Sequence, residues 1–353
     1  MEKQEKRPVQ KYVRDPAAIA KKIHVPTYDE ILERIKSRYP RRGKTLFDRE
    51  MARLQATFDI AISKTDFIRD LTRLLDSLHP FYWRIIEIDF DKRKIRDSLR
   101  CISRARRVSR EFYDKYRIHL MAAENKRELF KAGSEARGRI LSLYKKCRRS
   151  LDYLRNLVIF IQHLPGIEAE LPTIIVAGAP STGKSTFIRS VSRAQPKVAP
   201  YPFTTTSIHI GHAYVEDDKI QVIDTPGLLD REINEMNPVE RRAIAALKEL
   251  PGVVLFLIDV SGDRYMSIAR QFNLLNTVKE LIEDKPIIIG INKIDIADRD
   301  SLKEALDYAS RELDNGAISE YIELIASDKS SAYNVIRKIY LRYFSSRQAH
   351  AFD

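Results

Sequence analysis

The stretch Gly178-Ala179-Pro180-Ser181-Thr182-Gly183-Lys184-Ser185 decides the fold of this chain. It follows the apolar run 174–177 and precedes Thr186-Phe187-Ile188, which predicts a strand, a glycine-containing loop and the start of a helix in that order. A phosphate-binding loop needs this context, because its backbone N–H groups must point at phosphate oxygens. In such a loop Lys184 neutralises the β- and γ-phosphate oxygens, and the Ser185 hydroxyl can ligate Mg²⁺. The alternative is an ordinary glycine-bearing turn, which would have to match all of these positions by accident.

A second motif, Asn292-Lys293-Ile294-Asp295, follows the apolar run 287–291 and is expected at the carboxyl end of another buried strand. An aspartate there can accept two parallel hydrogen bonds from N1 and N2 of guanine, whereas adenine has no such pair of donors. Asp295 would therefore select GTP over ATP, and the stem of Lys293 would pack along the base. By itself the match is weak, because Asn292 or Asp295 could instead cap the next helix. Together with the phosphate loop it indicates a guanine nucleotide.

A third motif, Asp224-Thr225-Pro226-Gly227, follows the short apolar run 220–223, about forty residues after Lys184. This layout is typical of GTPase switch regions. Asp224 would hold Mg²⁺ through water and the Gly227 amide would donate to the γ-phosphate, although a plain turn is the alternative. A second sensor, and a further Mg²⁺ ligand, is expected from the threonines 204–206. Thr205 is favoured, Thr204 and Thr206 remain alternatives, and ordinary β-propensity also explains such a run.

The predicted chemistry is slow phosphoryl transfer. The residues expected to take part in it are Lys184, Thr205 and Gly227, and the expected metal ligands are Ser185, Thr205 and Asp224. The predicted contacts to GTP from these motifs are Gly178, Pro180, Ser181, Thr182, Gly183, Lys184, Ser185, Thr186, Asp224, Gly227, Asn292, Lys293 and Asp295. Leu228 occupies the place where many small GTPases carry a glutamine that orients water, and leucine cannot form hydrogen bonds through its side chain. Intrinsic hydrolysis is therefore expected to be slow and to depend on a partner.

Positive charge is concentrated in the first half of the 353 residues. Residues 1–170 carry 40 Lys and Arg against 24 Asp and Glu, whereas residues 171–353 carry 22 against 25. Because the half with the nucleotide motifs is nearly neutral, the phosphates of a nucleotide do not account for the basic character. A separate polyanionic partner is the inference.

Arginines recur at helical spacing within 93–107. They are Arg93, Arg96, Arg100, Arg104 and Arg107, and apolar residues recur on the opposite side. In this interpretation the arginines lack acidic partners three or four residues away, and arginine suits bidentate contact with phosphate. They are candidate RNA-binding residues, because an A-form surface fits a bundle face better than reading of a DNA groove does. The alternative is a solvated face of a helical bundle.

Two cysteines, Cys101 and Cys147, lie far apart in the sequence and both fall in helical patterns. Neither a metal site nor a disulfide framework is expected from them. No basic and apolar leader opens the sequence, and no apolar run approaches the roughly eighteen residues of a membrane span. The expected location is the reducing cytoplasm, without a membrane partner.

Further motifs give the chain a resemblance to a known family. They are Leu78-His79-Pro80-Phe81-Tyr82, Ser150-Leu151-Asp152-Tyr153-Leu154, Pro202-Phe203-Thr204-Thr205 with Gly211-His212, and Asp224-Thr225-Pro226-Gly227-Leu228-Leu229-Asp230. With these, nearly the whole chain resembles the nucleolar GTP-binding protein (Nog) family of GTPases in a short, archaeal-like form, within the wider Obg-like GTPases. The resemblance implies GTP binding with Mg²⁺, slow GTP hydrolysis, and an N-terminal helical bundle that binds ribosomal RNA. It also implies a role in assembling the large ribosomal subunit, with its precursor as partner and no DNA.

Two departures from the family pattern follow. Relatives usually carry Asn where this chain has Ser181, so potassium stimulation is not implied. The fifth guanine-binding element, usually Ser-Ala, is matched by Ala326-Ser327, which implies backbone contacts to guanine from these two residues.

The expected fold is a helical bundle followed by a Ras-like doubly wound α/β domain. The expected boundaries are 1–165 for a basic, RNA-binding bundle, 170–345 for the GTPase domain and 346–353 for a tail, with the junction at Leu164-Pro165-Gly166. Two alternatives to an assembly GTPase are an RNA-binding scaffold with GTP as a structural ligand, and a GTPase in translation or tRNA modification.

Overall fold

The basic half of the chain folds into helices because leucine, isoleucine, lysine and arginine recur there and glycine is absent from residues 44–132. The computed structural model describes residues 12–345 except 41, 42, 44, 205, 206, 227, 228, 230–234 and 283. It divides into two compact units, Met1–Leu78 with Asp89–His163, and His79–Ile88 with Leu164–Asp353. Each unit is described separately below.

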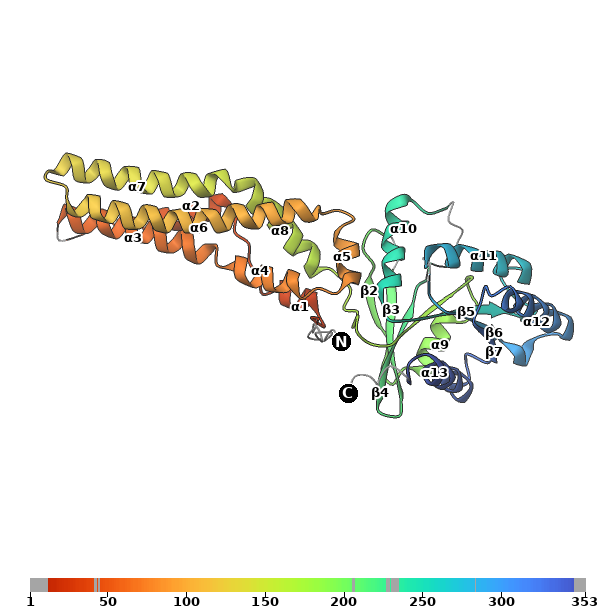
Figure 1. The fold of residues 1–353 in the computed structure, drawn as a ribbon. Helices are drawn as coiled ribbons and strands as arrows, with labels where there is room; N and C mark the ends of the chain where they lie inside the picture. Colours follow the sequence, from red (N-terminus) through yellow and green to blue (C-terminus); the bar gives the residue numbers. More distant parts are fainter. Residues whose placement is uncertain are drawn as a thin grey trace, which may run out of the picture. The chain divides into compact units, whose positions relative to one another are not determined.

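The first unit is helical (Figure 1). Its helices are α1 (Pro16–Ala20), α2 (Tyr28–Ser37), α3 (Leu46–Lys64), α4 (Phe67–Asp76), α6 (Lys92–Met121), α7 (Lys126–Lys146) and α8 (Arg148–Gln162). Side chains accept hydrogen bonds at several N-termini, for example Thr45 from the amide of Asp48 at 3.1 Å, which satisfies donors that the helix leaves free. Helices α3, α6 and α7 lie side by side (Figure 1). None of the helices in the described ranges is both long enough and apolar enough to cross a lipid bilayer.

A disulfide bond joins Cys101 of α6 to Cys147, the residue between α7 and α8. The expectation from the sequence, which saw no disulfide, is therefore wrong. Packing of α6 against α7 and α8 brings the two Cα atoms to 5.9 Å although 46 residues separate them in the sequence. Sequence spacing alone could not indicate this pair, because the contact is created by tertiary packing.

Reduction of this disulfide should destabilise the helical unit by about 2–4 kcal/mol, because the bond restricts the unfolded chain across a long loop. Urea unfolding with and without dithiothreitol measures the effect, and the Cys101→Ser/Cys147→Ser variant should unfold at the midpoint of the reduced protein. Free thiols in the unreduced protein, or coincident unfolding curves, would contradict the prediction.

Residues 79–88 belong to the second unit, although they fall inside the 1–165 segment predicted as a bundle. They form α5 (Pro80–Ile86), with His79 as the N-cap and Pro80 as the first helical residue. The Tyr82 hydroxyl donates to the carbonyl of Ile167 at 2.6 Å, and the Arg84 guanidinium pairs with Glu249 at 2.8 Å. Helical periodicity in the sequence predicts α5 but not the unit against which it packs.

The second unit is built on one mixed sheet, where the sequence predicts a Ras-like doubly wound α/β domain. In its described residues seven strands lie in the order β2-β3-β4-β1-β5-β6-β7 (Figure 1). They are β1 (Thr173–Gly178), β2 (Lys197–Pro200), β3 (Ser207–Val215), β4 (Asp218–Asp224), β5 (Gly252–Asp259), β6 (Ile287–Asn292) and β7 (Glu320–Leu324). The β2–β3 and β3–β4 pairs are antiparallel and the remaining pairs are parallel.

Helices cover both faces of this sheet (Figure 1). They are α9 (Lys184–Val191) and α13 (Lys329–Tyr343) on one face, and α10 (Pro238–Ala245), α11 (Ile268–Leu281) and α12 (Arg299–Asp314) on the other. Buried side chains of α9 and α13, among them Phe187 and Ile336, pack on Val176 and Leu255 of the sheet. The predicted bundle followed by a doubly wound α/β domain is thus confirmed as a fold class.

The parallel order β4-β1-β5-β6 places four strand ends at one edge of the sheet. In the register of the pairs, Val176 lies opposite Asp224, Gly178 opposite Leu257, and Asp259 opposite Asn292. Ligands of open α/β sheets bind at the carboxyl ends of the strands. The three sequence motifs therefore meet at this edge.

Candidate nucleotide-binding site

The phosphate loop connects β1 to α9, and its own side chains hold its shape. The Lys184 Nζ donates to the carbonyls of Gly178 and Ala179, each at 2.8 Å. The Thr182 hydroxyl donates to the Ala179 carbonyl at 2.9 Å. Lys184 is only 6% exposed, so its positive charge is held within the loop. The dipole of α9 also favours an anion at this end of the helix.

Two positions in the loop require glycine. Gly178 has φ +135°, and a Cβ there would lie 2.5 Å from the carbonyl oxygen of Leu257. Gly183, which precedes α9, has φ +96°, and a Cβ there would lie 2.5 Å from Nδ2 of Asn292. A side chain at either position would be strained and would push the loop away from β5 or β6.

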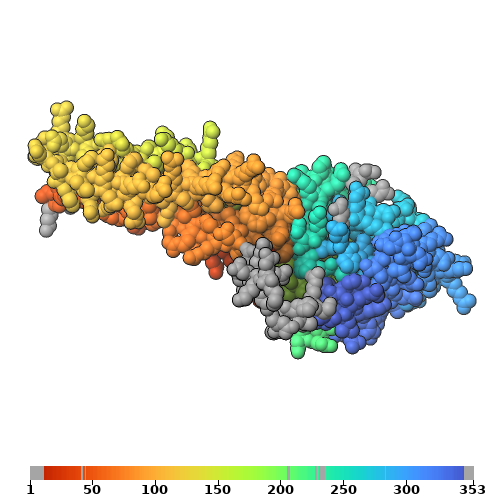
Figure 2. Space-filling model, viewed as in Figure 1, coloured from red at the N-terminus to blue at the C-terminus, as the bar shows by residue number. Residues whose placement is uncertain are grey.

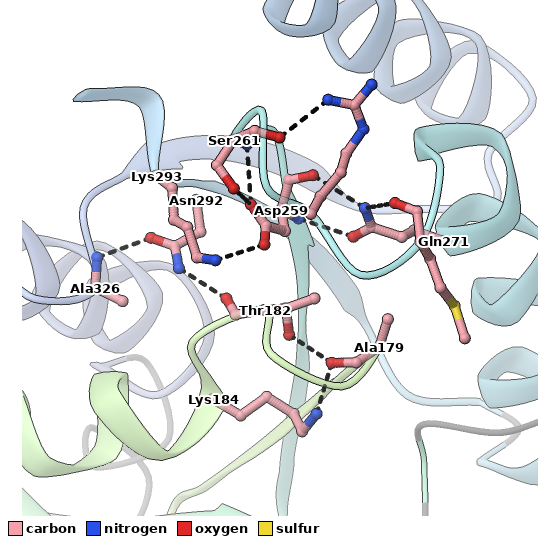
Figure 3. A network of polar contacts seen from close by, with 11 residues as sticks. Ala179, Thr182, Lys184, Asp259, Ser261, Gln271, Asn292, Lys293 and Ala326 are labelled. Atoms are coloured by element: carbon pink, nitrogen blue, oxygen red, sulfur yellow. Dashed lines mark hydrogen bonds and ion pairs between the residues drawn. The ribbon is translucent and has the colours of Figure 1, made fainter. Parts of the chain in front are cut away.

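Asn292 joins the phosphate loop to the predicted fifth guanine-binding element. Its Nδ2 donates to the carbonyl of Thr182 at 2.8 Å, and its Oδ1 accepts from the amide of Ala326 at 2.8 Å (Figure 3). Asn292 is 1% exposed, so both bonds are made away from water. The side chain therefore ties three separate loops together and does not itself point to solvent.

Lys293 is held by a residue that the sequence analysis missed. Its Nζ lies 2.5 Å from Oδ2 of Asp259, at the end of β5, and its backbone has φ +67° (Figure 3). The other oxygen of Asp259 accepts from the amide and hydroxyl of Ser261, at 2.9 and 2.7 Å. Gln271 bonds both backbone groups of Asp259. The available sequence signal for Asp259 was its position at the end of a strand that lies beside the strand ending at Asn292.

Neutralising Asp259 should weaken GTP binding. Asp259→Asn would remove the charge facing Lys293, which is 29% exposed on its side chain, and we expect a loss of about ten- to 150-fold in affinity from one charge-assisted contact. Fluorescent guanine nucleotides provide the measurement. The matched control is Glu312→Gln, which breaks the half-buried Lys279–Glu312 pair of the same unit, 2.6 Å long. Equal affinities for the two variants would contradict a role of Asp259 in the site.

Ser185 and Asp224 meet beside the phosphate loop. The Ser185 hydroxyl donates to Oδ2 of Asp224 at 2.6 Å, and Nδ1 of His209 lies 3.5 Å from the same oxygen. Asp224 is fully buried, and its Oδ1 has no hydrogen-bond partner among the described residues. An orphaned carboxylate oxygen next to a hydroxyl fits a hard divalent cation such as Mg²⁺.

The remaining predicted contacts lie around this centre or outside the described residues. Pro180, Thr186 and Ser185 are partly exposed, and Ser181, Asp295 and Ser327 are exposed. Ala326 is buried, and its carbonyl accepts from the Ser190 hydroxyl at 2.7 Å. Thr205, Thr206, Gly227 and Leu228 lie outside the described residues.

The arginine strip, Arg93, Arg96, Arg100, Arg104 and Arg107, is exposed along α6 of the helical unit. The expectation that these residues lack acidic partners nearby is wrong for two of them. Arg100 lies 3.4 Å from Asp97 and Arg107 lies 3.9 Å from Glu111. Both pairs are highly exposed, and such pairs contribute little to stability. The strip therefore remains a cationic surface.

Comparison with known proteins follows the same division of the chain. The model of the NOG1 N-terminal helical domain matches residues 21–168, and that of nucleolar GTP-binding protein 1 (NOG1) matches residues 238–295. A crystal structure of nucleolar GTP-binding protein 1 from Plasmodium falciparum is 33% identical over 54% of this chain and 94% of that chain, with a TM-score of 0.45.

Full-length NOG1 relatives are longer than the matched region. Nucleolar GTP-binding protein 1 of Caenorhabditis elegans is 31% identical over 79% of this chain and 42% of its own length. The protein of the same name from Drosophila melanogaster is 34% identical over 74% of this chain and 40% of its own length. The chain belongs to the NOG1 family. The chain thus spans less than half the length of these two NOG1 proteins.

Proposed function

We propose that this protein binds GTP, hydrolyses it slowly, and acts in large ribosomal subunit assembly by binding ribosomal RNA. The observation that carries the proposal is the bridge made by Asn292 between the phosphate loop at Thr182 and the backbone at Ala326. This bridge brings the phosphate loop, the Asn-Lys-Ile-Asp motif and the fifth guanine-binding element together at one edge of the sheet. Membership of the NOG1 family and the exposed cationic strip on α6 support the assembly role.

In this proposal the residues of the chain bind and orient the nucleotide. Lys184 exchanges its two carbonyl partners for the β- and γ-phosphate oxygens, and the amides that open α9 hold the remaining phosphate charge. Ser185, Asp224 and Thr205 would hold Mg²⁺, which neutralises charge on the phosphates when it is bound. Asp295 accepts the two guanine donors, with Lys293 held beside the base by Asp259.

Hydrolysis by the isolated protein should be slow. Because Leu228 replaces the glutamine that orients water in many small GTPases, we expect turnover far below the enzyme median of about ten per second. Phosphate release measured with and without large-subunit precursor particles checks this, and the particles should raise the rate. A purified protein that alone turns over at about that median rate would contradict the prediction.

Co-sedimentation separates the proposal from its alternatives. The purified chain is mixed with mature ribosomal subunits or with their precursors, at moderate salt, in the presence of GTP, GDP or a non-hydrolysable GTP analogue. An assembly GTPase should bind large-subunit precursors and be trapped on them by the analogue. Equal binding with GTP, GDP and the analogue would indicate a scaffold with GTP as a structural ligand. Binding to mature ribosomes instead of precursors would indicate a role in translation.

A further inference from the structure

A groove of about 500 Å³ lies between α6 and α7 in the helical unit. Its floor is formed by Ala105, Val108 and Leu143, and the Cys101–Cys147 disulfide lines it as well. Ala105 is buried, whereas Val108 and Leu143 are partly exposed. The two helices contribute much of the face of this unit seen in Figure 2. Apolar surface is thus open at a place where the disulfide ties α6 to the end of α7.

The rim of the groove is cationic. Arg100 and Arg104 stand one helical turn apart on α6, about 6 Å along its axis, and Lys146 stands on α7. No residue found to line the groove in the described part of the chain is acidic. Asp97 lies 3.4 Å from Arg100, but both side chains are more than 70% exposed, so the pair is weak. Neither Arg104 nor Lys146 has an ion-pair partner among the described residues.

We propose that this groove receives an unpaired base of a single-stranded or bulged RNA segment, with the flanking phosphates on Arg100, Arg104 and Lys146. The inference rests on the RNA binding proposed above and specifies where an unpaired nucleotide docks. A splayed base has two flat apolar faces and is flanked by charged phosphates, which matches an apolar floor with a cationic rim. A regular duplex offers phosphates but keeps its bases stacked, so it would leave the floor unused.

The test removes the apolar floor without changing charge. Val108→Gln/Leu143→Gln is compared with the wild-type full chain in binding a labelled twelve-nucleotide single strand and the same sequence as a perfect duplex. The expected result is about a five- to 150-fold weaker single-strand affinity, because polar amides replace two apolar side chains that would contact the base, with duplex affinity unchanged. Ile118→Gln is the matched control, because Ile118 is a 61% exposed apolar residue of α6 that does not line the groove.

A second pair of variants keeps the test decisive if the floor variant does not fold. Arg104→Gln should weaken single-strand binding more than Arg96→Gln, since Arg96 belongs to the same exposed strip but does not line the groove. Equal effects of these two variants would overturn the groove proposal. So would an unchanged preference for single strands in a folded floor variant. If the wild-type protein binds neither RNA, the RNA part of the proposed function fails together with the groove. If it binds both RNAs equally, only the groove proposal fails.

Discussion

Asp295→Asn should reverse the nucleotide preference of this protein. We expect its affinity for GTP to fall about a hundredfold or more, because the amide nitrogen of asparagine would face the N2 amine of guanine, and two charge-assisted hydrogen bonds would be lost. Xanthosine triphosphate carries a carbonyl in place of that amine, so the variant should bind it better than GTP. The wild-type protein should bind inosine triphosphate about ten- to 150-fold more weakly than GTP, since one of the two bonds is missing. Competition against a fluorescent guanine nucleotide measures all of these affinities.

Local geometry makes this substitution informative. Asp295 is exposed and, among the described residues, the structure gives it no hydrogen bond or ion pair, so its replacement does not break the fold. The matched control is Asp298→Asn in the same loop. Asp298 caps α12 by accepting from the amide of Ser301 at 2.7 Å, and asparagine caps a helix equally well. A GTP preference that is unchanged in Asp295→Asn would remove the assignment of this motif to guanine.

Much of the second unit follows from local sequence. The apolar runs 174–177, 220–223 and 287–291 lie in β1, β4 and β6, which belong to the parallel part of the sheet. Each run is short, rich in β-branched residues and followed by a polar loop, so it predicts a buried strand. Parallel strands end at the same edge, so the motifs that follow them converge without further information. The prediction that these loops meet therefore needed only the order of elements.

Contacts between distant segments were not predictable in this way. Asp259 belongs to none of the sequence motifs, and only the register of β5 against β6 brings its carboxylate to Lys293. The Cys101–Cys147 bond depends on how α6 packs against the end of α7. The Arg100–Asp97 and Arg107–Glu111 pairs are a different case, because their spacings of three and four residues can be read from the sequence alone. Predicting a pair between distant segments requires the fold, whereas a pair within one helix can be predicted from residue spacing alone.

A buried carboxylate in the helical unit leads to the second large effect. Glu50 of α3 is fully buried, and its two oxygens lie 2.9 Å from Arg53 and 2.5 Å from Arg137 of α7. Gly133 makes room for this pairing, since a Cβ there would lie 2.7 Å from Oε2 of Glu50. Both guanidiniums also lie near the ring of Tyr39, at 5.5 and 5.8 Å from its centroid. Arg49 of α3 also lies 3.9 Å from Glu50, so this one carboxylate is the counter-charge for arginines of both α3 and α7.

Glu50→Ala should destabilise the helical unit by about 3–5 kcal/mol, because it leaves Arg137 buried without a counter-charge. For a unit of this size that corresponds to a melting temperature lower by about 6–20 °C. Calorimetry of the full chain separates the two units, since GTP should raise the transition of the second unit only. In Glu50→Ala, the transition that GTP does not shift is the one whose melting temperature should fall.

The control for Glu50→Ala is Glu111→Ala. Glu111 lies 3.9 Å from Arg107 in the same unit, but both side chains are over 60% exposed, so its removal should cost less than about 1 kcal/mol. A further variant, Glu50→Met/Arg137→Met, replaces the buried charges by apolar groups and should recover most of the lost stability. If Glu50→Ala and Glu111→Ala shift the same transition equally, burial of the charged pair does not matter. If the double methionine variant is no more stable than Glu50→Ala, the loss comes from packing and not from an unpaired charge.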